Sequence, residues 1–439
     1  MGFFSGKSRI KVRGYKELTN AKPPMEFVKP KVIAVPLKHM GVEAFDVHVK
    51  IGDMVKIGTK IATRSDHFTV PLFSSVSGKV IGIEKRDHST IKKTQHIIIE
   101  NDFNDEKELL AEPIDDINHL TREFVNDAIK NFGIVGLGGA GFPTYVKYVF
   151  ADNTNTVLLN GVECEPYITT DDLYMKQHPE LLVQGLLLLM KAADADNGII
   201  AIKEDKKELF QFLTDYRLGH YKGYNIKIVQ VTDRYPVGWE RVLIRNVCGL
   251  EYDRLPSEAG VVVNNTTTAI SLANCIKTGM PMYERYVTFS GNGFKKPQNA
   301  KVRIGTVLAD AIEAIGGYTD DVARKSRLVC GGPMMGASIV SDAVSINTAN
   351  NAFLCFTNER ETQVACLCCG RCIEHCPSNL QPVQISRFSQ EKDFDTLKKL
   401  AVNKCIGCGT CSYICPSNID VTEAVTRAKQ LYIKRETAI

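Results

Sequence analysis

The chain has 439 residues, of which 54 are Lys or Arg and 50 are Asp or Glu, giving a formal net charge of +4. This small surplus is scattered along the chain, so a nucleic-acid-binding surface is not expected. The hydrophobic fraction of 44% and the charged fraction of 24% are typical of globular protein, and the length corresponds to about three domains of roughly 150 residues each.

Targeting signals and cysteine usage narrow the class of protein further. The N-terminal segment has no apolar core of the kind that a signal peptide needs. The most apolar run, Leu181–Met190, is far shorter than the ~20 residues of a membrane span. Of the 14 cysteines, nine fall between Cys366 and Cys415, which is typical of a reduced, metal-binding protein. We therefore expect a soluble or peripherally attached protein.

The first part of the chain predicts an extended arm followed by a small β domain. Residues 1–30 are basic, loop-like and interrupted by prolines. Residues 31–102 contain short alternating apolar runs, a spacing typical of a β-sandwich or barrel. The predicted strands are Val47–Ile51, Val55–Ile57, Lys60–Ala62, Ser77–Ile83 and Gln95–Glu100.

This β domain contains the phrases VKIGDMVKIGTKIA and SVSGKVIGIE, which resemble a barrel-sandwich hybrid of the biotinyl and lipoyl type. Carriers of that type present a modifiable Lys at a hairpin tip. The corresponding stretch here, Arg64–Phe68, contains no Lys. We therefore interpret the domain as a structural relative of these carriers and not as a swinging arm.

Residues 118–282 alternate between helical and strand patterns, which predicts a parallel sheet covered on both faces. The predicted strands are Val157–Leu159, Gly198–Ile202, Ile226–Val231 and Val261–Val263. The predicted helices are Arg122–Asn131, Asp172–Ala193, Lys206–Leu213, Glu240–Val247 and Ala269–Lys277.

Two further units complete the chain. Residues 283–345 predict a smaller α+β unit, with strands at Arg285–Ser290 and Lys301–Ile304 and a helix at Val307–Ile315. Residues 355–430 hold the cysteine cluster, and a final helix is predicted at Val421–Lys434.

The cysteine cluster consists of two strings with the same spacing. Each string reads C-x2-C-x2-C-x3-C-P, the run that two-cluster ferredoxins use to hold [4Fe–4S] clusters. In such proteins the fourth cysteine of each string binds the other cluster. One predicted ligand set is therefore Cys366, Cys369, Cys372 and Cys415, and the other is Cys405, Cys408, Cys411 and Cys376.

The alternative for these cysteines is a pair of zinc sites. Zinc sites usually show two C-x2-C pairs or mixed Cys and His ligands, and they do not need two identical quartets. Cys368 lies inside the first string without breaking its spacing. We interpret Cys368 as a bystander or as a thiol beside the cluster. The module predicts a one-electron relay.

A glycine-rich loop follows the apolar pair Ile134-Val135 and precedes a predicted helix that begins near Pro143. Glycines let the backbone approach a phosphate, and a helix N-terminus offers unpaired N–H donors. Lys147, one turn into that helix, adds a positive charge. A glycine-rich loop alone is equally consistent with a structural turn.

Polar clusters also follow two predicted strands. Asn160, Glu163 and Glu165 come after one strand, and Asn264, Asn265 and Thr266 after another. In open α/β sheets, ligands bind beyond the carboxyl ends of strands, where acids and amides can hold ribityl, ribose or ring groups. The alternative for each cluster is helix capping, to which Asn265 and Thr266 are well suited.

Taken together, these motifs resemble a known class of flavoprotein. The phrases GLGGAGFPT, NGVECEP, YPVGWE and VVVNNTT, in that order, resemble the NADH-oxidising flavin subunit of respiratory complex I. The full layout resembles the RnfC family of Rnf-complex subunits still more closely. This resemblance covers essentially residues 30–420 and includes the phrases VTFSGNGFKKPQNAKVRIGT and GGPMMG. The resemblance implies a multidomain α/β protein with an N-terminal barrel-sandwich hybrid, a Rossmann-like flavoprotein core, an SLBB β-grasp-like domain and a C-terminal two-cluster ferredoxin-like helical domain.

The resemblance also implies cofactors and site residues. It implies FMN held by a loop containing Gly136, Gly138, Gly139 and Gly141, and NAD(H) bound beside it. The residues that would surround the flavin and its phosphate are Lys147, Asn160, Asn264, Asn265 and Thr266. The residues that would lie near the flavin and the nicotinamide are Phe142, Phe150, Glu163, Glu165, Tyr235, Gly238 and Glu240, with Glu165 and Glu240 as the catalytic acids. Trp239 and Val162 depart from the complex I pattern, in which acids stand.

The function implied by the resemblance is that of a peripheral subunit of an ion-translocating oxidoreductase at the cytoplasmic face of the cell membrane. Hydride would pass between NAD(H) and FMN, and single electrons between FMN and the two clusters. The implied partners are membrane Rnf subunits and a ferredoxin-type Rnf subunit, with membrane contact only through them and no nucleic acid. Two alternatives are a cobalamin reductase, in which the sandwich domain lies at the C-terminal end, and a non-catalytic wiring subunit with a vestigial nucleotide pocket.

Overall fold

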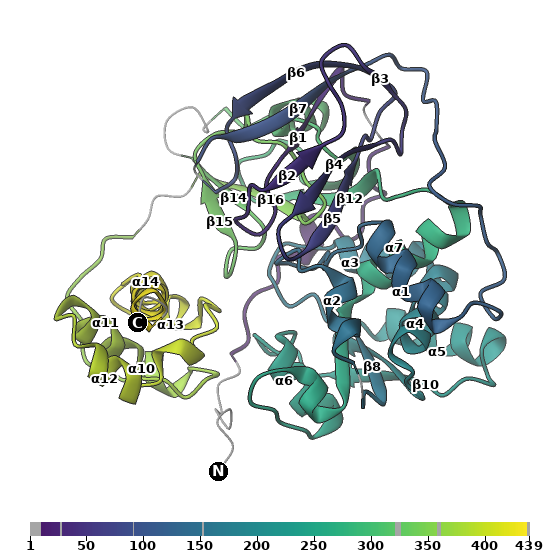
Figure 1. Ribbon diagram of the computed structural model, residues 1–439. Coiled ribbons are helices and arrows are strands. Elements are labelled where there is room, and N and C mark those ends of the chain that lie inside the picture. Colours follow the sequence, from purple (N-terminus) through teal and green to yellow (C-terminus); the bar gives the residue numbers. More distant parts are fainter. Residues whose placement is uncertain are drawn as a thin grey trace.

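The computed structural model describes residues 10–26, 29–90, 92–151, 153–320, 326–357 and 361–436. Figure 1 shows a β-rich part at the top, an α/β part at the lower right and a small helical module at the lower left. Residues 1–9 and 27–28 of the expected arm lie outside the described residues. Among the described residues, no helix combines the length and the apolarity that crossing a membrane requires.

The N-terminal β domain is a sandwich of two antiparallel sheets, as predicted. One sheet has the order β1-β7-β6-β3, formed by Val32–Pro36, Thr94–Asn101, Gly78–Arg86 and Met54–Val55. The other has the order β2-β4-β5, formed by Phe45–Val47, Lys60–Ser65 and Thr69–Phe73. Ile33, Ile61, Ile97 and Ile99 fill the core between them. The strand predicted at Val47–Ile51 is wrong beyond Val47: β2 ends there, and a turn closed by Lys50 and Asp53 follows it.

The α/β unit contains a four-stranded parallel sheet with the order β10-β9-β8-β11. Its strands are β8 (Thr156–Gly161), β9 (Asn197–Lys203), β10 (Ile226–Val231) and β11 (Val261–Asn265). Its helices are α1 (Arg122–Asn131), α2 (Thr144–Val149), α3 (Thr170–Gln177), α4 (Pro179–Ala193), α5 (Lys207–His220), α6 (Glu240–Cys248) and α7 (Thr266–Thr278), and a 3₁₀ turn, η2, covers Pro256–Ala259.

Both faces of this sheet are buried, which confirms the prediction from the helix–strand alternation. Val157, Leu159 and Ile200 pack on one face against the core that α1, α4 and α7 share. Leu158 and Val263 belong to the opposite face, where α6 contributes to the core. Alternate residues of one strand therefore serve two cores, as expected for a strand buried on both sides.

The single long helix predicted at Asp172–Ala193 is wrong. The structure breaks it at His178, whose φ of −130° is not helical, so that α3 ends and α4 begins at Pro179. Proline lacks the N–H that a helix interior requires but is well tolerated in the first turn. The break lets α3 carry Asp171 and Asp172 in its first turn.

The third unit is a mixed five-stranded sheet with the order β13-β12-β16-β14-β15. Its elements are β12 (Glu284–Ser290), β13 (Gln298–Arg303), α8 (Leu308–Ala314), β14 (Arg327–Cys330), β15 (Ala337–Ile339) and β16 (Ala352–Phe356). The sequence predicted only β12, β13 and α8. The sheet continues past residue 345, since β16 pairs parallel with β12 and antiparallel with β14.

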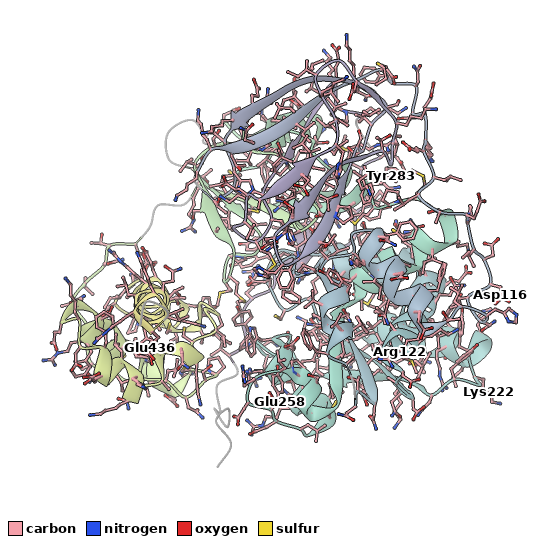
Figure 2. All side chains as sticks on the ribbon, viewed as in Figure 1. Asp116, Arg122, Lys222, Glu258, Tyr283 and Glu436 are labelled. Carbon is pink, nitrogen blue, oxygen red and sulfur yellow. The ribbon has the colours of Figure 1, made fainter. Side chains whose placement is uncertain are left out.

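The C-terminal module is helical. Its elements are α10 (Arg371–Glu374), α11 (Pro382–Gln390), α12 (Phe394–Lys399), η3 (Val402–Lys404), α13 (Thr410–Tyr413) and α14 (Val421–Glu436). Figure 2 places Glu436, at the end of α14, in this module, and Arg122 and Glu258 in the α/β unit. The module contacts the rest of the chain through Cys408, which packs with Ile10 and Tyr235.

Helices α4 and α7 approach each other closely at one glycine, which gives a test of the fold. A Cβ added to Gly185 would lie 2.1 Å from the carbonyl oxygen of Ala269. We expect Gly185→Ala to lower the free energy of unfolding by about 1–3 kcal/mol, because backbone must shift to relieve the overlap. Gly219→Ala, in α5 with open space around it, is the control and is expected to be neutral or stabilising by up to about 1 kcal/mol. Equal stabilities of the two variants in chemical denaturation would contradict the packing.

Candidate functional site

A cavity of about 820 Å³ opens where three of the units meet. Its walls come from the carboxyl ends of β8 and β11, from the sandwich domain near His39 and Pro71, and from the five-stranded unit near Gly331 and Asn350. Ligand-binding sites of about 300–1,000 Å³ are usual for molecules the size of a cofactor. The carboxyl ends of parallel strands are the expected place for such a site.

Most of the residues that the sequence singled out line this cavity. They are Gly136, Gly138, Gly139, Gly141, Phe142, Lys147, Asn160, Glu163, Glu165, Gly238, Glu240, Asn264 and Asn265. Three expected residues are not brought to it. Phe150, which follows α2, is 62% exposed, and Thr266 is fully buried with its hydroxyl unpartnered. Tyr235 is buried and turns its hydroxyl toward the cysteine module.

The two departures from the complex I pattern differ in position. Val162 is completely buried in the core on the α6 side of the sheet, so it leaves the cavity unchanged. Trp239 lines the cavity beside Glu240 at the start of α6. Only Trp239 can therefore alter the shape of the site directly.

The glycine loop packs against the start of α7. Val135 forms a bridge with Pro143, and the Gly136 N–H donates to the Phe142 carbonyl at 2.8 Å, which closes the loop on itself. A Cβ at Gly138 would lie 2.7 Å from Nδ2 of Asn265, so a side chain there would collide. Gly139 has open space around it. No sheet strand precedes the loop among the described residues.

The sandwich domain supports the glycine loop from the other side. His39 contacts the Gly141 carbonyl through Nε2 at 2.7 Å, and Arg64 holds the other ring nitrogen of His39 at 2.9 Å. Arg64 also forms a two-point ion pair with Asp66, which lowers the pKa of that carboxyl. Phe68 packs edge-on against Phe142, with ring centroids 5.7 Å apart. The hairpin tip that carries a modifiable Lys in biotinyl and lipoyl domains is here docked on the glycine loop.

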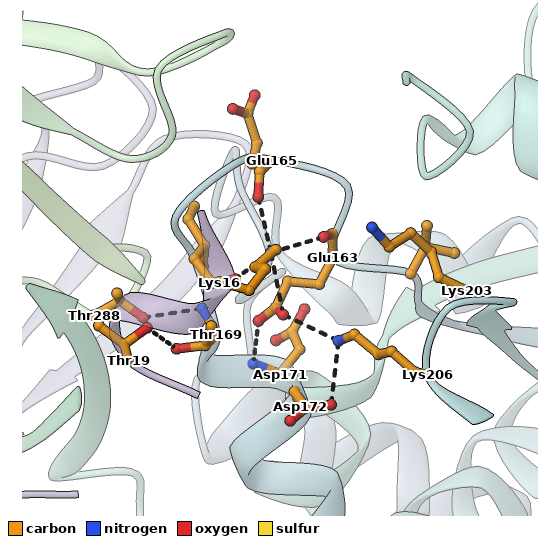
Figure 3. A network of polar contacts seen from close by, with 12 residues as sticks. Lys16, Thr19, Glu163, Glu165, Thr169, Asp171, Asp172, Lys203, Lys206 and Thr288 are labelled. Atoms are coloured by element: carbon orange, nitrogen blue, oxygen red, sulfur yellow. Dashed lines mark hydrogen bonds and ion pairs between the residues drawn. The ribbon is translucent and has the colours of Figure 1, made fainter. Parts of the chain in front are cut away.

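A buried network of charges surrounds the loop that follows β8 (Figure 3). Glu163 has a side chain only 3% exposed and pairs with Lys16 at 3.3 Å and with Lys206 at 3.1 Å. Lys206 also pairs with Asp172 at 3.3 Å. Burial lowers the pKa of Lys206, but the carboxylates of Glu163 and Asp172 outweigh it and raise the pKa overall. Glu163 itself adopts a positive φ of 46°, a conformation that costs roughly 1 kcal/mol or more and persists only where its surroundings enforce it.

The sequence analysis missed both lysines of this network. Lys206 follows β9 as Glu163 follows β8, so the rule that ligands gather at the carboxyl ends of strands could have indicated it. Lys16 comes from the N-terminal arm, 147 positions from Glu163, and no local pattern marks it.

Glu165 contacts the five-stranded unit and Tyr235. Its Oε2 accepts a hydrogen bond from the Met334 N–H at 3.1 Å, and its Oε1 lies 3.5 Å from the Tyr235 hydroxyl. Burial raises the pKa of Glu165 to about 7, against the opposing effect of the backbone N–H groups of Met334 and Met335. A carboxyl group with this pKa exchanges protons at neutral pH.

Lys147 and Glu240 also line the cavity. Lys147 donates to the Val263 carbonyl at 2.7 Å and lies 3.8 Å from Glu240. Burial lowers the pKa of Lys147. Glu240 also accepts a hydrogen bond from Tyr252 at 3.0 Å. The cavity lining therefore carries several carboxylates and the partly desolvated ammonium group of Lys147.

The donors around the cavity fit a flavin nucleotide. The open space beside Gly139 leaves room for a phosphate to approach the loop backbone. Lys147 supplies a positive charge, and Asn160 and Asn264 supply amides at the strand ends.

Four of the eight predicted cluster cysteines line a second, small cavity. These are Cys376, Cys405, Cys408 and Cys411. Burial raises the pKa of each thiol, most clearly that of Cys411, to about 12. Backbone N–H groups of Leu380 and Gly407 point at the sulfurs of Cys376 and Cys405, both at 3.4 Å. Four clustered thiols, of which those of Cys376 and Cys408 are buried and those of Cys376 and Cys405 face backbone N–H groups, fit the donor set that an iron–sulfur cube requires.

The other predicted set is more open. Cys366 and Cys369 are exposed and Cys372 and Cys415 are partly buried. Cys368, also exposed, has a positive φ of 52° and donates its N–H toward the Cys366 sulfur at 3.4 Å. No group of three His, Cys, Asp or Glu side chains in the described part of the chain is arranged as a single metal-ion site. A cube of four irons spaces its cysteines more widely than one ion does.

Tyr235 connects the two cavities. Its hydroxyl donates to the Cys408 carbonyl at 2.7 Å and lies near Glu165, which lines the large cavity. Its backbone forms an antiparallel bridge with Ile10 of the N-terminal arm. Tyr235 thus contacts the lining residue Glu165 and the second cysteine string through its side chain, and the arm through its backbone.

Comparison with family models identifies the units of the chain. The RnfC barrel sandwich hybrid domain matches residues 4–104, the Nuo51 FMN-binding domain residues 129–274, the SLBB domain residues 286–338 and the 4Fe-4S dicluster domain residues 365–419. The predicted architecture is confirmed, and so are the predicted cofactors, FMN and two [4Fe–4S] clusters.

Similar proteins cover nearly the whole chain. The C subunit of the Na(+)-translocating ferredoxin:NAD(+) oxidoreductase complex of Acetobacterium woodii is 33% identical over 390 residues, 87% of this chain and 86% of that protein. The corresponding subunit of the proton-translocating complex of Clostridium ljungdahlii is 31% identical over 86% of this chain and 83% of that protein. The corresponding subunit of the ion-translocating oxidoreductase complex of Vibrio cholerae is 32% identical over 88% of this chain and 50% of that protein.

Among solved structures, a chain of an NAD+-reducing [NiFe]-hydrogenase aligns with a TM-score of 0.49 and 16% identity, over 72% of this chain and 61% of the other. The relatives of known sequence are more informative, because they match most of this chain and most of their own length. The chain belongs to the RnfC family, the C subunits of ion-translocating oxidoreductase (Rnf) complexes.

Proposed function

We propose that this chain is the NAD(H)-linked electron-transfer subunit of a ferredoxin:NAD oxidoreductase complex that translocates ions. The observation that carries the proposal is that one buried side chain, Tyr235, connects two cavities. One cavity has the size of a flavin, and the other is lined by four cysteines. The names of the relatives from Acetobacterium woodii and Clostridium ljungdahlii support the same activity.

The residues around the large cavity divide into binding and proton-handling roles. When bound, FMN supplies hydride exchange with NAD(H) and single-electron transfer to the clusters. The glycine loop and Lys147 hold the phosphate, and Asn160, Asn264 and Asn265 orient the flavin from the strand ends. Glu165 exchanges a proton near neutral pH, and Glu240 fixes the position of Lys147. Phe142 and Trp239 shape the side of the cavity that admits the nicotinamide.

The cysteines divide into an inner and an outer set. Cys376, Cys405, Cys408 and Cys411 hold the cluster beside the flavin cavity, supported by their common cavity. Cys366, Cys369, Cys372 and Cys415 hold the outer cluster, supported by the crossed ligand rule of two-cluster ferredoxins. When bound, the outer cluster would be the one able to exchange electrons with partners, because its cysteines include the exposed Cys366 and Cys369.

The partners are other subunits of the complex, namely its membrane subunits and a ferredoxin-type subunit, and the chain lies peripherally at the cytoplasmic face of the membrane. The N-terminal position of the sandwich domain favours this function over cobalamin reduction. A wiring subunit without nucleotide chemistry would not need a glycine loop held from both sides by Asn265 and His39.

The proposed activity can be measured on the anaerobically purified, reconstituted chain. We expect FMN to be released on denaturation, and NADH to reduce an artificial one-electron acceptor. Clusters without flavin binding or NADH oxidation would leave only the wiring function. Reduction of cob(III)alamin in preference to ferredoxin-linked activity would favour the cobalamin reductase.

Glu165→Gln tests the buried carboxyl group through the pH dependence of stability. The pKa of Glu165 is raised from 4.5 in an exposed setting to about 7 in the fold. Between these pH values the unfolded chain loses its proton first, so stability falls as pH rises from about 4.5 to about 7 and is constant beyond. The full difference is roughly 3 kcal/mol. We expect Gln, which cannot ionise, to abolish this slope.

The measurement for Glu165 is the free energy of unfolding of the flavin-free chain at pH 5 and pH 8, compared between wild type and Glu165→Gln. The variant is expected to gain stability relative to wild type at the higher pH. Glu258→Gln, at an exposed carboxyl in η2, is the matched control. A constant difference between wild type and Glu165→Gln across this range would contradict the raised pKa.

Cysteine replacements test the ligand sets. We expect Cys408→Ser and Cys376→Ser each to remove the same cluster, so that iron falls from about eight to about four atoms per chain and the same cluster signal disappears from the electron paramagnetic resonance spectrum. Cys372→Ser is expected to remove the other signal. Cys368→Ser, the control inside the first string, is expected to leave the iron content unchanged. Different signals lost in Cys408→Ser and Cys376→Ser would disprove the pairing.

A further inference from the structure

The loop that follows β8 bends around the ammonium group of Lys16. Lys16 Nζ donates to the carbonyl of Glu163 at 3.0 Å, to that of Glu165 at 2.9 Å and to that of Ile168, and it also contacts Glu163 Oε2 at 3.3 Å. The three carbonyls come from one short stretch and converge on a single cation, as Figure 3 shows. The lysine thus occupies the centre of the loop.

This arrangement cannot persist without a cation. The Lys16 side chain is 15% exposed and that of Glu163 is 3% exposed, so water cannot replace the lost donor without opening the loop. Buried carbonyl and carboxylate oxygens that lose their partner carry the full cost of desolvation. Burial lowers the pKa of Lys16, while the nearby Glu163 carboxylate opposes the shift and favours the charged form.

The ammonium connects to the cofactor cavity through consecutive hydrogen bonds. Glu163 Oε1 accepts the Asp171 N–H at 2.8 Å, and Asp171 Oδ2 accepts a hydrogen bond from Asn265 Nδ2 at 2.7 Å. Asn265 in turn packs against Gly138 of the glycine loop. A change at Lys16 is therefore transmitted to Glu163, Glu165 and Asn265, all of which line the cavity.

The N-terminal arm is fixed on both sides of Lys16. The Tyr15 ring stacks on that of Tyr167, with centroids 4.6 Å apart, and the Gly14 carbonyl accepts the Tyr167 N–H at 2.6 Å. Thr19 contacts Thr169 at 2.8 Å between the two hydroxyl oxygens. The arm therefore runs alongside the loop of residues 162–169, the acid loop. These contacts fix the path by which Lys16 enters the acid loop.

We propose that Lys16 is a positioning residue of the cofactor site, delivered by the N-terminal arm, whose ammonium group holds Glu163 and Glu165 where flavin binding requires them. The proposal rests on the proposed function of the large cavity as a flavin site. It makes the arm a part of that site, since the cation at the centre of the acid loop comes from outside the FMN-binding domain.

The first test is the dissociation constant for FMN, measured by quenching of flavin fluorescence on the flavin-depleted full-length chain. Lys16→Met is expected to raise it at least tenfold. Lys22→Met is the matched control: the same residue type in the same arm, exposed and bonded to the Pro297 carbonyl at 2.9 Å. Lys22→Met is expected to change the constant less than twofold. Wild-type affinity in Lys16→Met would overturn the proposal, whereas no FMN binding by the wild type would overturn the proposed function.

A double-mutant cycle with Glu163→Gln separates positioning from general support of the fold. If Lys16 acts by holding Glu163, Lys16→Met raises the FMN dissociation constant at least threefold less in the Glu163→Gln background than in the wild type. Equal effects in both backgrounds would overturn the proposal, because a purely structural arm would act alike in each. Lys16→Met/Glu163→Gln also removes the buried carboxylate that Lys16→Met leaves with Lys206 as its ammonium partner, so it remains measurable where Lys16→Met alone is poorly folded. Iron content and circular dichroism confirm that each variant is folded.

Discussion

The cofactor cavity depends on the burial of carboxylates at the carboxyl edge of the parallel sheet. Glu163, Asp171 and Asp172 lie within a few residues of each other and are almost completely buried. An isolated buried carboxylate is too costly to persist, so each needs a cation or several hydrogen-bond donors. Lys16 and Lys206 provide the cations, and they arrive from the N-terminal arm and from the end of β9. The acid loop is therefore a product of the whole chain and not of the strand that precedes it.

The same dependence on distant segments applies to the rest of the cavity. The glycine loop is closed by its own hydrogen bonds but is held in place by Asn265 on one side and His39 on the other. The five-stranded unit contributes the Met334 N–H that holds Glu165. Since each wall belongs to a different unit, the cavity exists only when the sandwich, the α/β unit and the five-stranded unit are assembled. This gives a physical reason for joining these domains in one chain.

The sequence alone predicts those features of the fold that depend on residues close together in the chain. Apolar periodicity located α1 and β10 to the residue, and cysteine spacing located the two strings. Long-range contacts left no local pattern: β14 to β16 form one sheet with β12 through pairings that no turn signal marks, and Lys16 has no neighbour that suggests its partner. The break at Pro179 was predictable in principle, because proline is disfavoured inside a helix, but the strong apolar pattern on both sides obscured it.

The two cysteine sets differ in their surroundings, and this difference has consequences for electron transfer. Cys376 and Cys408 are buried, and the inner set lies beside Tyr235 and the cofactor cavity, whereas Cys366 and Cys369 face the solvent. Solvent exposure and hydrogen bonds to the sulfurs are the main means by which a protein sets the potential of a [4Fe–4S] cluster. Two clusters held in such different surroundings will not have equal potentials. A relay with one buried end against the flavin site and one exposed end therefore separates the place where a hydride is split into single electrons from the place where a partner exchanges them.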